Sequence, residues 1–349
     1  MLYAELFGIG ICCIFVIPTK VSKLAQSLLQ DIQDGRLAAT RADGAIQMEL
    51  VQGLSAVPAS ISPKFFYDTL GSKLFEAICT LDEYYPTRTE FDIFTRHADD
   101  IAASVGTGVT LIDLGAGNCA KAARLFPLLQ PCQYVPIDIS AQFLSEAVAG
   151  LRQKFPAIPM QEVALDFSSS LQLPASIGRD HRLFFYPGSS LGNFHPDEAL
   201  QFLRRLRHGL VPGQTGGLLI GVDLVKHHAL LDAAYDDALG VTAAFNRNVL
   251  LHVNRLLGSD FVIGHWQHCG FFNAAQSRVE MHLEARHNVT VNWPGGQRKF
   301  LRGERIHTEN SYKFTPDGFA DLLHQAGFGQ CQMWFDQHKW FMLCHAQPL

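Results

Sequence analysis

A glycine-rich turn directly after a short apolar run limits the possible folds of this chain more than any other feature. The apolar residues 109–114 lead into Asp113-Leu-Gly115-Ala-Gly117-Asn118-Cys-Ala120, and a helical stretch follows. Glycines allow the backbone to turn tightly and to approach a ligand closely, and the N-terminus of the following helix favours negative charge. The pattern predicts a strand, a ligand-binding turn and a helix in succession.

The alternation of strands and helices extends over the middle of the chain. Helical stretches separate this first run from further short apolar runs at residues 134–139, 160–165, 183–186 and 218–222. Strands that alternate with helices predict an α/β fold with a doubly wound, mostly parallel sheet and right-handed crossovers.

After Lys226 the alternation stops. The spacing predicts a long helix at residues 228–257, extended stretches around 261–266 and 279–291, a helix at 318–326 and a final strand at 340–345. We therefore expect two domains. The doubly wound core comprises residues 89–225 and 314–349, and a second, smaller substrate-binding domain comprises residues 21–88 and 226–313.

Residues 1–20 form an N-terminal extension of uncertain role. Its apolar run at residues 6–18 is well short of the roughly 20 residues that a membrane-spanning helix needs. No Lys or Arg precedes the run, so it is a poor signal peptide. Helix-type spacing begins after it, at residues 22–52, with leucines at intervals and charges between them.

The overall composition excludes several classes of protein. Apolar residues make up 48% of the chain, which excludes disorder, and the net charge of −5 comes without any basic stripe for nucleic acid. None of the eight cysteines forms a C-x-x-C pair, so we expect reduced thiols and a cytoplasmic location. His265-Trp-Gln-His268 lacks the additional ligands that zinc needs, so we expect no metal.

Acidic residues at two later strand ends extend the case for a nucleotide-like ligand. Asp138 ends the second run, 23 positions after Gly115, where an acid accepts hydrogen bonds from ribose hydroxyls. Asp166 and Phe167 end the third run and suit the amino group and the ring of an adenine. The alternatives are a glycine turn needed only for packing, and a helix N-cap followed by a core phenylalanine. The loop alone does not separate a dinucleotide from S-adenosylmethionine.

The fourth run leads into a second glycine loop, Pro187-Gly188-Ser189-Ser190-Leu191-Gly192-Asn193. Residues 188–192 match the G-x-S-x-G elbow of α/β-hydrolases, with Ser190 as the nucleophile. No HGGG-type segment for an oxyanion hole accompanies the match, and a hydrolase leaves the first glycine loop unexplained. The other interpretation is a turn that closes over a substrate, with the Asn193 amide as donor and acceptor.

Seven segments, spread from about Ser62 to the C-terminus, resemble the S-adenosylmethionine-dependent, histidine-specific Nα-methyltransferases of ergothioneine biosynthesis. They are SPKFFYDTLGSKLFE, EYYPTRTE, IDLGAGNCAK, PGSSLGNF, AAYDDALGVTAAFNRNVLLHVNR, RVEMHL and GERIHTENSYKF. The segments are long and largely peculiar to this family, and residues 1 to about 45 are not covered. The resemblance implies a Rossmann-like class I methyltransferase core and an enzyme that adds three methyl groups to the α-amino group of L-histidine, giving hercynine.

The resemblance also implies roles for individual residues. S-adenosylmethionine would contact Gly115, Lys121, Asp138, Asp166 and Phe167. The histidine would be held by Tyr84, Gly188, Asn193, Tyr235, Met281, Glu309 and Ser311. Among these, Tyr84, Asn193 and Tyr235 would hold the amino and carboxylate groups during the reaction, while Glu309 and Ser311 would recognise the imidazole.

Two further expectations follow from the resemblance. Glu309 and Ser311 favour histidine over the substrates of related N-methyltransferases, which act on other aromatic amino acids or indole derivatives. We also expect a monomer whose partner is this small molecule, without nucleic acid or membrane.

Overall fold

The structure, a computed structural model, describes residues 36–168 and 170–349. The chain divides into two compact units, Met1–Val51 and Gln52–Leu349. Helix α2 (Arg36–Ser55) begins in the first unit and ends in the second. The helix predicted over residues 22–52 is thus confirmed from Arg36 onward, whereas residues 22–35 and the extension at residues 1–20 lie outside the described residues.

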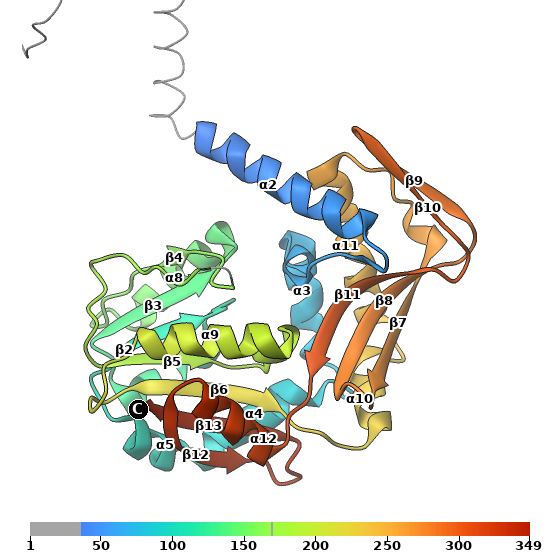
Figure 1. Ribbon diagram of the computed structural model, residues 1–349. Helices are drawn as coiled ribbons and strands as arrows, with labels where there is room; N and C mark the ends of the chain where they lie inside the picture. The colour runs from blue at the N-terminus through green and yellow to red at the C-terminus, as the bar shows by residue number, and fades with distance from the viewer. Residues whose placement is uncertain (1–35, 169) are drawn as a thin grey trace, which may run out of the picture. The chain divides into compact units, whose positions relative to one another are not determined.

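A seven-stranded sheet forms the core of the second unit (Figure 1). Its strands lie in the order β12 (Phe328–Phe335), β13 (Phe341–Pro348), β6 (Gly217–Asp223), β5 (Arg182–Tyr186), β2 (Thr110–Leu114), β3 (Gln133–Asp138) and β4 (Val163–Ala164). Strand β13 runs antiparallel to β6 and β12, and the pairs from β6 to β4 are parallel. The strand order reverses at β2, and ligands of such sheets bind beyond the carboxyl ends of the strands at this switch point.

Helices cover both faces of this sheet. One face packs on α9 (Pro196–His208) and α12 (Pro316–Gln325) through Phe202, Leu203, Phe319 and Leu323. The other face packs on α4 (Tyr85–Arg96), α5 (Ala98–Val105), α7 (Phe126–Leu129) and α8 (Ala141–Lys154). Because both faces are covered, β2, β5 and β6 are buried along their whole length, which is why their sequences are continuous apolar runs. The predicted α/β class is confirmed.

A second sheet carries the remaining strands, in the order β1 (Ala59–Ser60), β11 (Arg305–Tyr312), β8 (Arg278–Ala285) and β7 (Trp266–Asn273). Helices α10 (His228–Tyr235) and α11 (Val241–Leu257) pack on β7 and β8. Helix α3 (Thr69–Ile78) and the 3-10 helix η1 (Pro63–Phe66) pack on α11 in turn. A separate hairpin joins β9 (Val289–Trp293) to β10 (Gly296–Phe300).

Strand β11 contains a β-bulge. His307 and Glu309 pair with consecutive residues of β8, which leaves Thr308 as the extra residue. The Thr308 hydroxyl lies within hydrogen-bond distance of two acceptors, the Asn246 side-chain oxygen on α11 at 2.8 Å and the Met281 carbonyl oxygen at 3.0 Å. The bulge is therefore tied both to a neighbouring strand and to a helix.

Some predicted elements were wrong in their extent. The long helix at residues 228–257 is two helices, because Gly240 adopts φ 75° and the Asp237 carboxylate caps α11 by accepting from the N–H groups of Val241 and Thr242. Residues 261–266 are not a strand: they contain the 3-10 helix η3 (Ile263–His265), and β7 begins only at Trp266. The stretch at residues 279–291 belongs to two strands, β8 and β9.

The edges of the large sheet also differ from the prediction. Strand β12 was missed, and the run at residues 160–165 is reduced to β4 (Val163–Ala164) plus a single bridge between Met160 and Tyr134. Both sheets lie within Gln52–Leu349, a single compact unit, so the division into a core and a substrate domain stays a prediction. None of the described helices is long and apolar enough to cross a membrane.

Candidate active site

The turn after β2 has the backbone that its glycines predict. Gly115 and Gly117 have φ of 70° and 52°, in the left-handed region that favours glycine. The N–H groups of Gly115 and Ala116 donate to the Ile137 carbonyl oxygen at 2.9 and 3.0 Å, which holds the turn against the end of β3. A Cβ on Gly115 would meet the ring of Phe167 at 3.7 Å and no backbone atom. The missing side chain at Gly115 therefore leaves an open cradle, a space next to the Phe167 ring that backbone atoms do not fill.

Asp138, the last residue of β3, is bonded to this turn. Its carboxylate accepts from the N–H groups of Gly117 and Ser140, both at 3.0 Å. Each carboxylate oxygen has a second acceptor position. The carboxylate can therefore accept from two adjacent hydroxyl groups while it holds the turn.

Asp166 and Phe167 follow β4. The Asp166 carboxylate accepts from the N–H of Ser168 at 3.0 Å and lies 3.7 Å from the Lys64 ammonium. No helix begins at this point, so the helix N-cap alternative is wrong. The Phe167 ring is half-buried, with its centroid 5.8 Å from that of Tyr186. It packs on the core and also faces the glycine turn.

A buried carboxylate joins the two glycine loops. The carboxylate of Glu90, on α4, contacts the Lys121 ammonium at 2.6 Å and accepts from the N–H of Gly188 at 2.7 Å. Glu90 is only 1% exposed. Lys121 belongs to the short helix α6 (Ala120–Ala123) after the first glycine loop, and Gly188 belongs to the loop after β5. The loops at the switch point are thus fixed to each other through one side chain.

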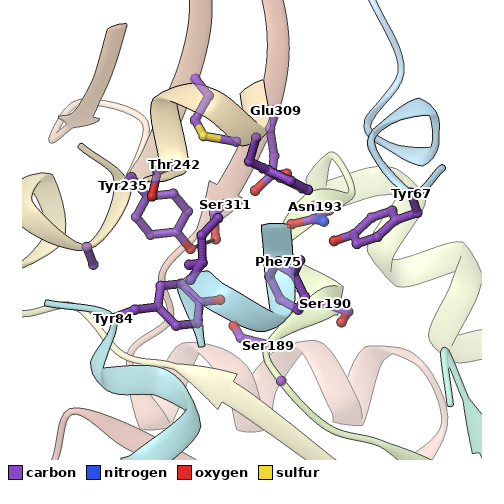
Figure 2. Close-up of a pocket in the computed structure, with 15 residues that line it drawn as sticks. Tyr67, Phe75, Tyr84, Ser189, Ser190, Asn193, Tyr235, Thr242, Glu309 and Ser311 are labelled. Atoms are coloured by element: carbon purple, nitrogen blue, oxygen red, sulfur yellow. Dashed lines mark hydrogen bonds between the residues drawn. The ribbon is translucent and has the colours of Figure 1, made fainter. Parts of the chain in front are cut away.

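A pocket with about 510 Å³ of empty space, partly open to solvent, adjoins the second loop. Figure 2 shows Tyr84 and Tyr235 on one side of it and Asn193 and Tyr67 on the other. All seven residues predicted to bind substrate line it, namely Tyr84, Gly188, Asn193, Tyr235, Met281, Glu309 and Ser311.

Segments far apart in the sequence supply these side chains. Tyr84 directly precedes α4, and Asn193 ends the 3-10 helix η2 (Ser190–Asn193). Tyr235 ends α10, just before the interruption between α10 and α11 that Gly240 makes possible. Burial raises the pKa of the Tyr84 and Tyr235 hydroxyls above the usual range, so both stay protonated at neutral pH.

The strand β11 contributes the pocket's carboxylate. Glu309 is 8% exposed and faces the pocket opposite Met281 of β8, in the register that the bulge establishes. Burial raises the pKa of Glu309 to about 7, although the nearby Lys313 opposes this shift. A buried carboxylate in this position favours a ligand that donates a hydrogen bond to it.

Ser311 and Tyr235 belong to a buried hydrogen-bonded network. The Tyr235 hydroxyl lies 2.8 Å from the Ser311 hydroxyl, and the Lys313 ammonium lies 2.9 Å from each of them. Lys313 is held by the Asp223 carboxylate at 2.8 Å, which also contacts Lys226 at 2.5 Å. Burial raises the pKa of Asp223, but Lys313 and Lys226 together outweigh this effect and hold it below its usual range.

The comparisons with known proteins agree with this geometry. Residues 46–348 match the family model described as histidine-specific methyltransferase, SAM-dependent. The chain is 40% identical over 306 residues to a histidine N-alpha-methyltransferase of Mycolicibacterium smegmatis, covering 86% of this chain and 94% of that protein. The chain belongs to the SAM-dependent, histidine-specific methyltransferases.

Two further relatives support the assignment. The histidine N-alpha-methyltransferase of Mycobacterium tuberculosis is 38% identical over 299 residues, covering 84% of this chain and 92% of that protein. Ergothioneine biosynthesis protein 1 of Neurospora crassa is 27% identical over 288 residues, covering 79% of this chain and 32% of that protein. The family resemblance predicted from the sequence is confirmed, and with it the prediction of a methyltransferase that uses S-adenosylmethionine as methyl donor.

The hydrolase alternative does not fit this methyltransferase. Ser190 lies in η2, and its hydroxyl donates to the Pro187 carbonyl oxygen at 3.4 Å. Gly188 and Ser189, and not Ser190, have a left-handed backbone, at φ 77° and 60°, and the Ser189 hydroxyl accepts from the N–H of Asp223. The G-x-S-x-G match at residues 188–192 is therefore a turn that forms one wall of the methyltransferase pocket.

The two histidines considered as metal ligands have packing roles. His268 is bonded through its two ring nitrogens to the Tyr235 carbonyl oxygen and the Asn246 side chain, both at 2.8 Å. The His265 ring packs edge-on against His287. Across residues 36–168 and 170–349, no three His, Cys, Asp or Glu side chains are grouped so that they could hold a metal ion.

Sequence analysis missed several residues of the methyltransferase pocket and its support. The pocket also contains Tyr67, Phe75, Ile78, Ala234, Thr242 and Phe245. The support includes Glu90, Asp223 and Lys313, whose charged groups are buried. Charged residues inside apolar segments were the available signal: Asp223 ends a buried strand, and Lys313 follows Ser311 by two positions, on the same side of the chain.

Proposed function

We propose that this methyltransferase transfers three methyl groups from S-adenosylmethionine to the α-amino group of L-histidine, giving hercynine, in ergothioneine biosynthesis. The observation that carries the proposal is the pairing of Glu309 and Ser311 on one wall of a pocket that also contains five aromatic side chains and the Asn193 amide. An imidazole is a planar ring with one N–H donor and one acceptor nitrogen. A carboxylate and a hydroxyl, side by side, match that pattern.

The residues at the switch point suit S-adenosylmethionine, which supplies a methyl group on a sulfonium. Asp138 has acceptor positions left for the ribose hydroxyls, and the cradle at Gly115 is open in front of Phe167. We assign the adenine to Phe167 and Asp166, and the amino-acid end to Lys121. Lys121 is 39% exposed in its side chain, so its ammonium remains accessible to a carboxylate.

Tyr84, Asn193 and Tyr235 orient the amino and carboxylate groups of the substrate. The attacking amine needs a free lone pair, so it must bind as the neutral form or lose its proton on binding. The raised pKa of Tyr84 and Tyr235 keeps both hydroxyls neutral, which suits them to orientation and not to general-base catalysis. The chain's contribution to the rate is then mainly to fix the amine in line with the methyl group.

Repeated methylation produces a quaternary ammonium, and the pocket suits such a product. The rings of Tyr84, Tyr235, Tyr67 and Phe75 surround the space next to Asn193 (Figure 2). Aromatic faces attract cations that lack N–H groups. Each transfer breaks the sulfonium–methyl bond, releases S-adenosylhomocysteine and leaves a positive charge on the nitrogen. The mono- and dimethylated ammonium each lose one proton to solvent at the open side of the pocket before the next transfer.

The alternative substrate is another aromatic amino acid or an indole derivative. The carboxylate of Glu309 argues against a purely apolar ring, because it would be left without a partner. We further propose a monomer in the cytoplasm that needs no metal. The thiols support this location, since all six cysteines among the described residues are free.

The test is incubation of the purified protein and S-adenosylmethionine with each free amino acid, followed by mass spectrometry. Histidine alone should gain three methyl groups. Methylation of another amino acid would overturn the roles of Glu309 and Ser311 and keep the family. Absence of any methylated product would overturn the proposed function.

A further inference from the structure

Lys313 is completely buried directly behind the wall that carries Ser311. Its side chain is 0% exposed, and its ammonium has three partners: Asp223 at 2.8 Å, the Tyr235 hydroxyl at 2.9 Å and the Ser311 hydroxyl at 2.9 Å. An ammonium has three N–H donors and no acceptor. Every donor of Lys313 is therefore used, and both hydroxyls must accept from it.

The remaining hydrogen bond of the network has a preferred direction. The hydroxyls of Tyr235 and Ser311 lie 2.8 Å apart, so one of them donates to the other. A phenol is the stronger donor and an aliphatic hydroxyl the stronger acceptor, and the nearby ammonium strengthens the phenol further. Tyr235 therefore donates to Ser311. Ser311 then accepts from both Lys313 and Tyr235, and its two lone pairs are occupied.

We propose that Lys313 is a positioning residue that restricts Ser311 to the role of hydrogen-bond donor toward the substrate ring. With its lone pairs occupied, Ser311 can only offer its own proton to the pocket. The ring nitrogen that faces Ser311 must then be unprotonated, and the other ring nitrogen donates to Glu309. The site would thus select one tautomer of the neutral imidazole. This inference rests on the proposed function, in which Glu309 and Ser311 bind the ring of histidine.

The surroundings of Lys313 keep its ammonium protonated, so that it always donates hydrogen bonds. Burial alone would lower its pKa, but Asp223 outweighs burial and raises the pKa above the usual range of lysine. The same carboxylate is also bonded to the Tyr85 hydroxyl at 2.7 Å and to Lys226. Asp223 therefore keeps two partners when Lys313 is replaced, and the fold should tolerate Lys313→Met.

The test is a double-mutant cycle on Lys313→Met and Ser311→Ala, with the KM for histidine and kcat measured at saturating S-adenosylmethionine. Each single variant should raise the KM about tenfold and change kcat less than about threefold. Because Lys313 acts through Ser311, the double variant should raise the KM only about 10- to 20-fold. An additive effect of about 100-fold would overturn the proposal, as would a fall in kcat without a change in KM.

Lys226→Met is the matched control, since Lys226 is a buried lysine on the same carboxylate without a contact to Ser311 or Tyr235. It should leave the KM for histidine within about twofold. If it raises the KM as much as Lys313→Met does, loss of buried charge is the cause and the proposal fails. Calorimetric binding of S-adenosylmethionine verifies the fold of each variant. If Lys313→Met does not fold, Lys313→Gln, which keeps N–H donors, replaces it in the cycle. Lys313→Gln should raise the KM for histidine about threefold, and its effect should again not add to that of Ser311→Ala.

The wild-type protein separates this inference from the proposed function. Wild-type turnover of histidine together with an additive cycle would overturn only the role of Lys313. A wild-type protein that binds S-adenosylmethionine and methylates no histidine would overturn both.

Discussion

The proposed cofactor end, around Gly115 and Asp138, and the proposed ring-binding wall, Glu309 and Ser311, are built in different ways. At the cofactor end, the glycine turn is positioned by backbone hydrogen bonds to Ile137 and to the carboxylate of Asp138. At the ring-binding wall, Glu309 and Ser311 are backed by a network of buried charges around Asp223 and Lys313. The first end depends on backbone conformation, and the second depends on neutralising charge in the interior. Substitutions should therefore affect the two ends independently.

The largest expected effect is on the ring-binding wall. Glu309→Ala should lower kcat/KM for histidine about 1,000-fold, because a buried partner of the imidazole N–H is lost. Binding of S-adenosylmethionine, measured by calorimetry, should stay within about twofold if the two ends are independent. Glu284→Ala, on β8, is the control: Glu284 is bonded to Arg305 and does not line the pocket. If Glu309→Ala weakened S-adenosylmethionine binding as much as it lowered kcat/KM for histidine, the two ends of the site would not be independent.

A second substitution tests the buried charges that support this wall. Asp223→Asn leaves the cations of Lys226 and Lys313 without a counter-ion, so the free energy of unfolding should fall by about 3 kcal/mol. Urea denaturation measures the change. Asp260→Asn, at an exposed carboxylate bonded to Asn292, should cost less than about 1 kcal/mol. If both variants lost the same unfolding free energy, the buried charges around Asp223 would contribute no more to stability than an exposed carboxylate does.

A substitution at the cofactor end should weaken the binding of S-adenosylmethionine and leave the KM for histidine nearly unchanged. Asp138→Ala should weaken S-adenosylmethionine binding about 30-fold through lost ribose hydrogen bonds and a looser turn. Asp138→Asn keeps one acceptor oxygen, so its affinity for S-adenosylmethionine should fall less than that of Asp138→Ala. The KM for histidine at saturating S-adenosylmethionine should change less than about threefold. A larger change would mean that the turn also shapes the substrate pocket.

A further effect concerns pH. The pKa of Glu309 is raised from 4.5 to about 7 in the fold. Its contribution to stability is therefore fully present below about pH 4.5 and is lost as the pH rises through about 7. Relative to Glu309→Gln, the wild-type protein should lose about 2.5 kcal/mol of unfolding free energy between pH 5 and pH 8. Urea denaturation at both pH values measures the difference, and a difference that does not change with pH would mean that Glu309 is not desolvated.

The same contrast explains how much could be predicted from the sequence. Gly115, Gly117 and Asp138 could be identified because local conformation and strand order determine their places. Glu309 and Ser311 could be assigned only through the family resemblance, since nothing in their immediate sequence indicates that Tyr235 and Asn193 lie across the same pocket. The supporting charges of Glu90, Asp223 and Lys313 were missed, because a charge next to an apolar segment is only a weak signal until its burial is known.

The errors in secondary structure have a related cause. Periodicity is continuous through residues 228–257, so the break at Asp236–Gly240 is detected only by recognising that Asp237 caps a new helix. That break ends α10 at Tyr235 and so determines where this tyrosine lies. Local capping of this kind begins a new helix although the apolar periodicity continues.

The bulge at Thr308 has a consequence for comparing relatives. Side chains alternate between the two faces of a strand, and the bulge absorbs one extra residue so that the pairing resumes beyond it. Glu309 and Ser311 pair with Met281 and Val279 of β8, as they would in a regular ladder without Thr308. Deleting Thr308 would therefore keep the ring-binding pair on the pocket face and remove only the hydroxyl that bonds to Asn246 and Met281. When related sequences are aligned, a gap of one residue at this point therefore carries less information about substrate choice than a substitution of Glu309 or Ser311.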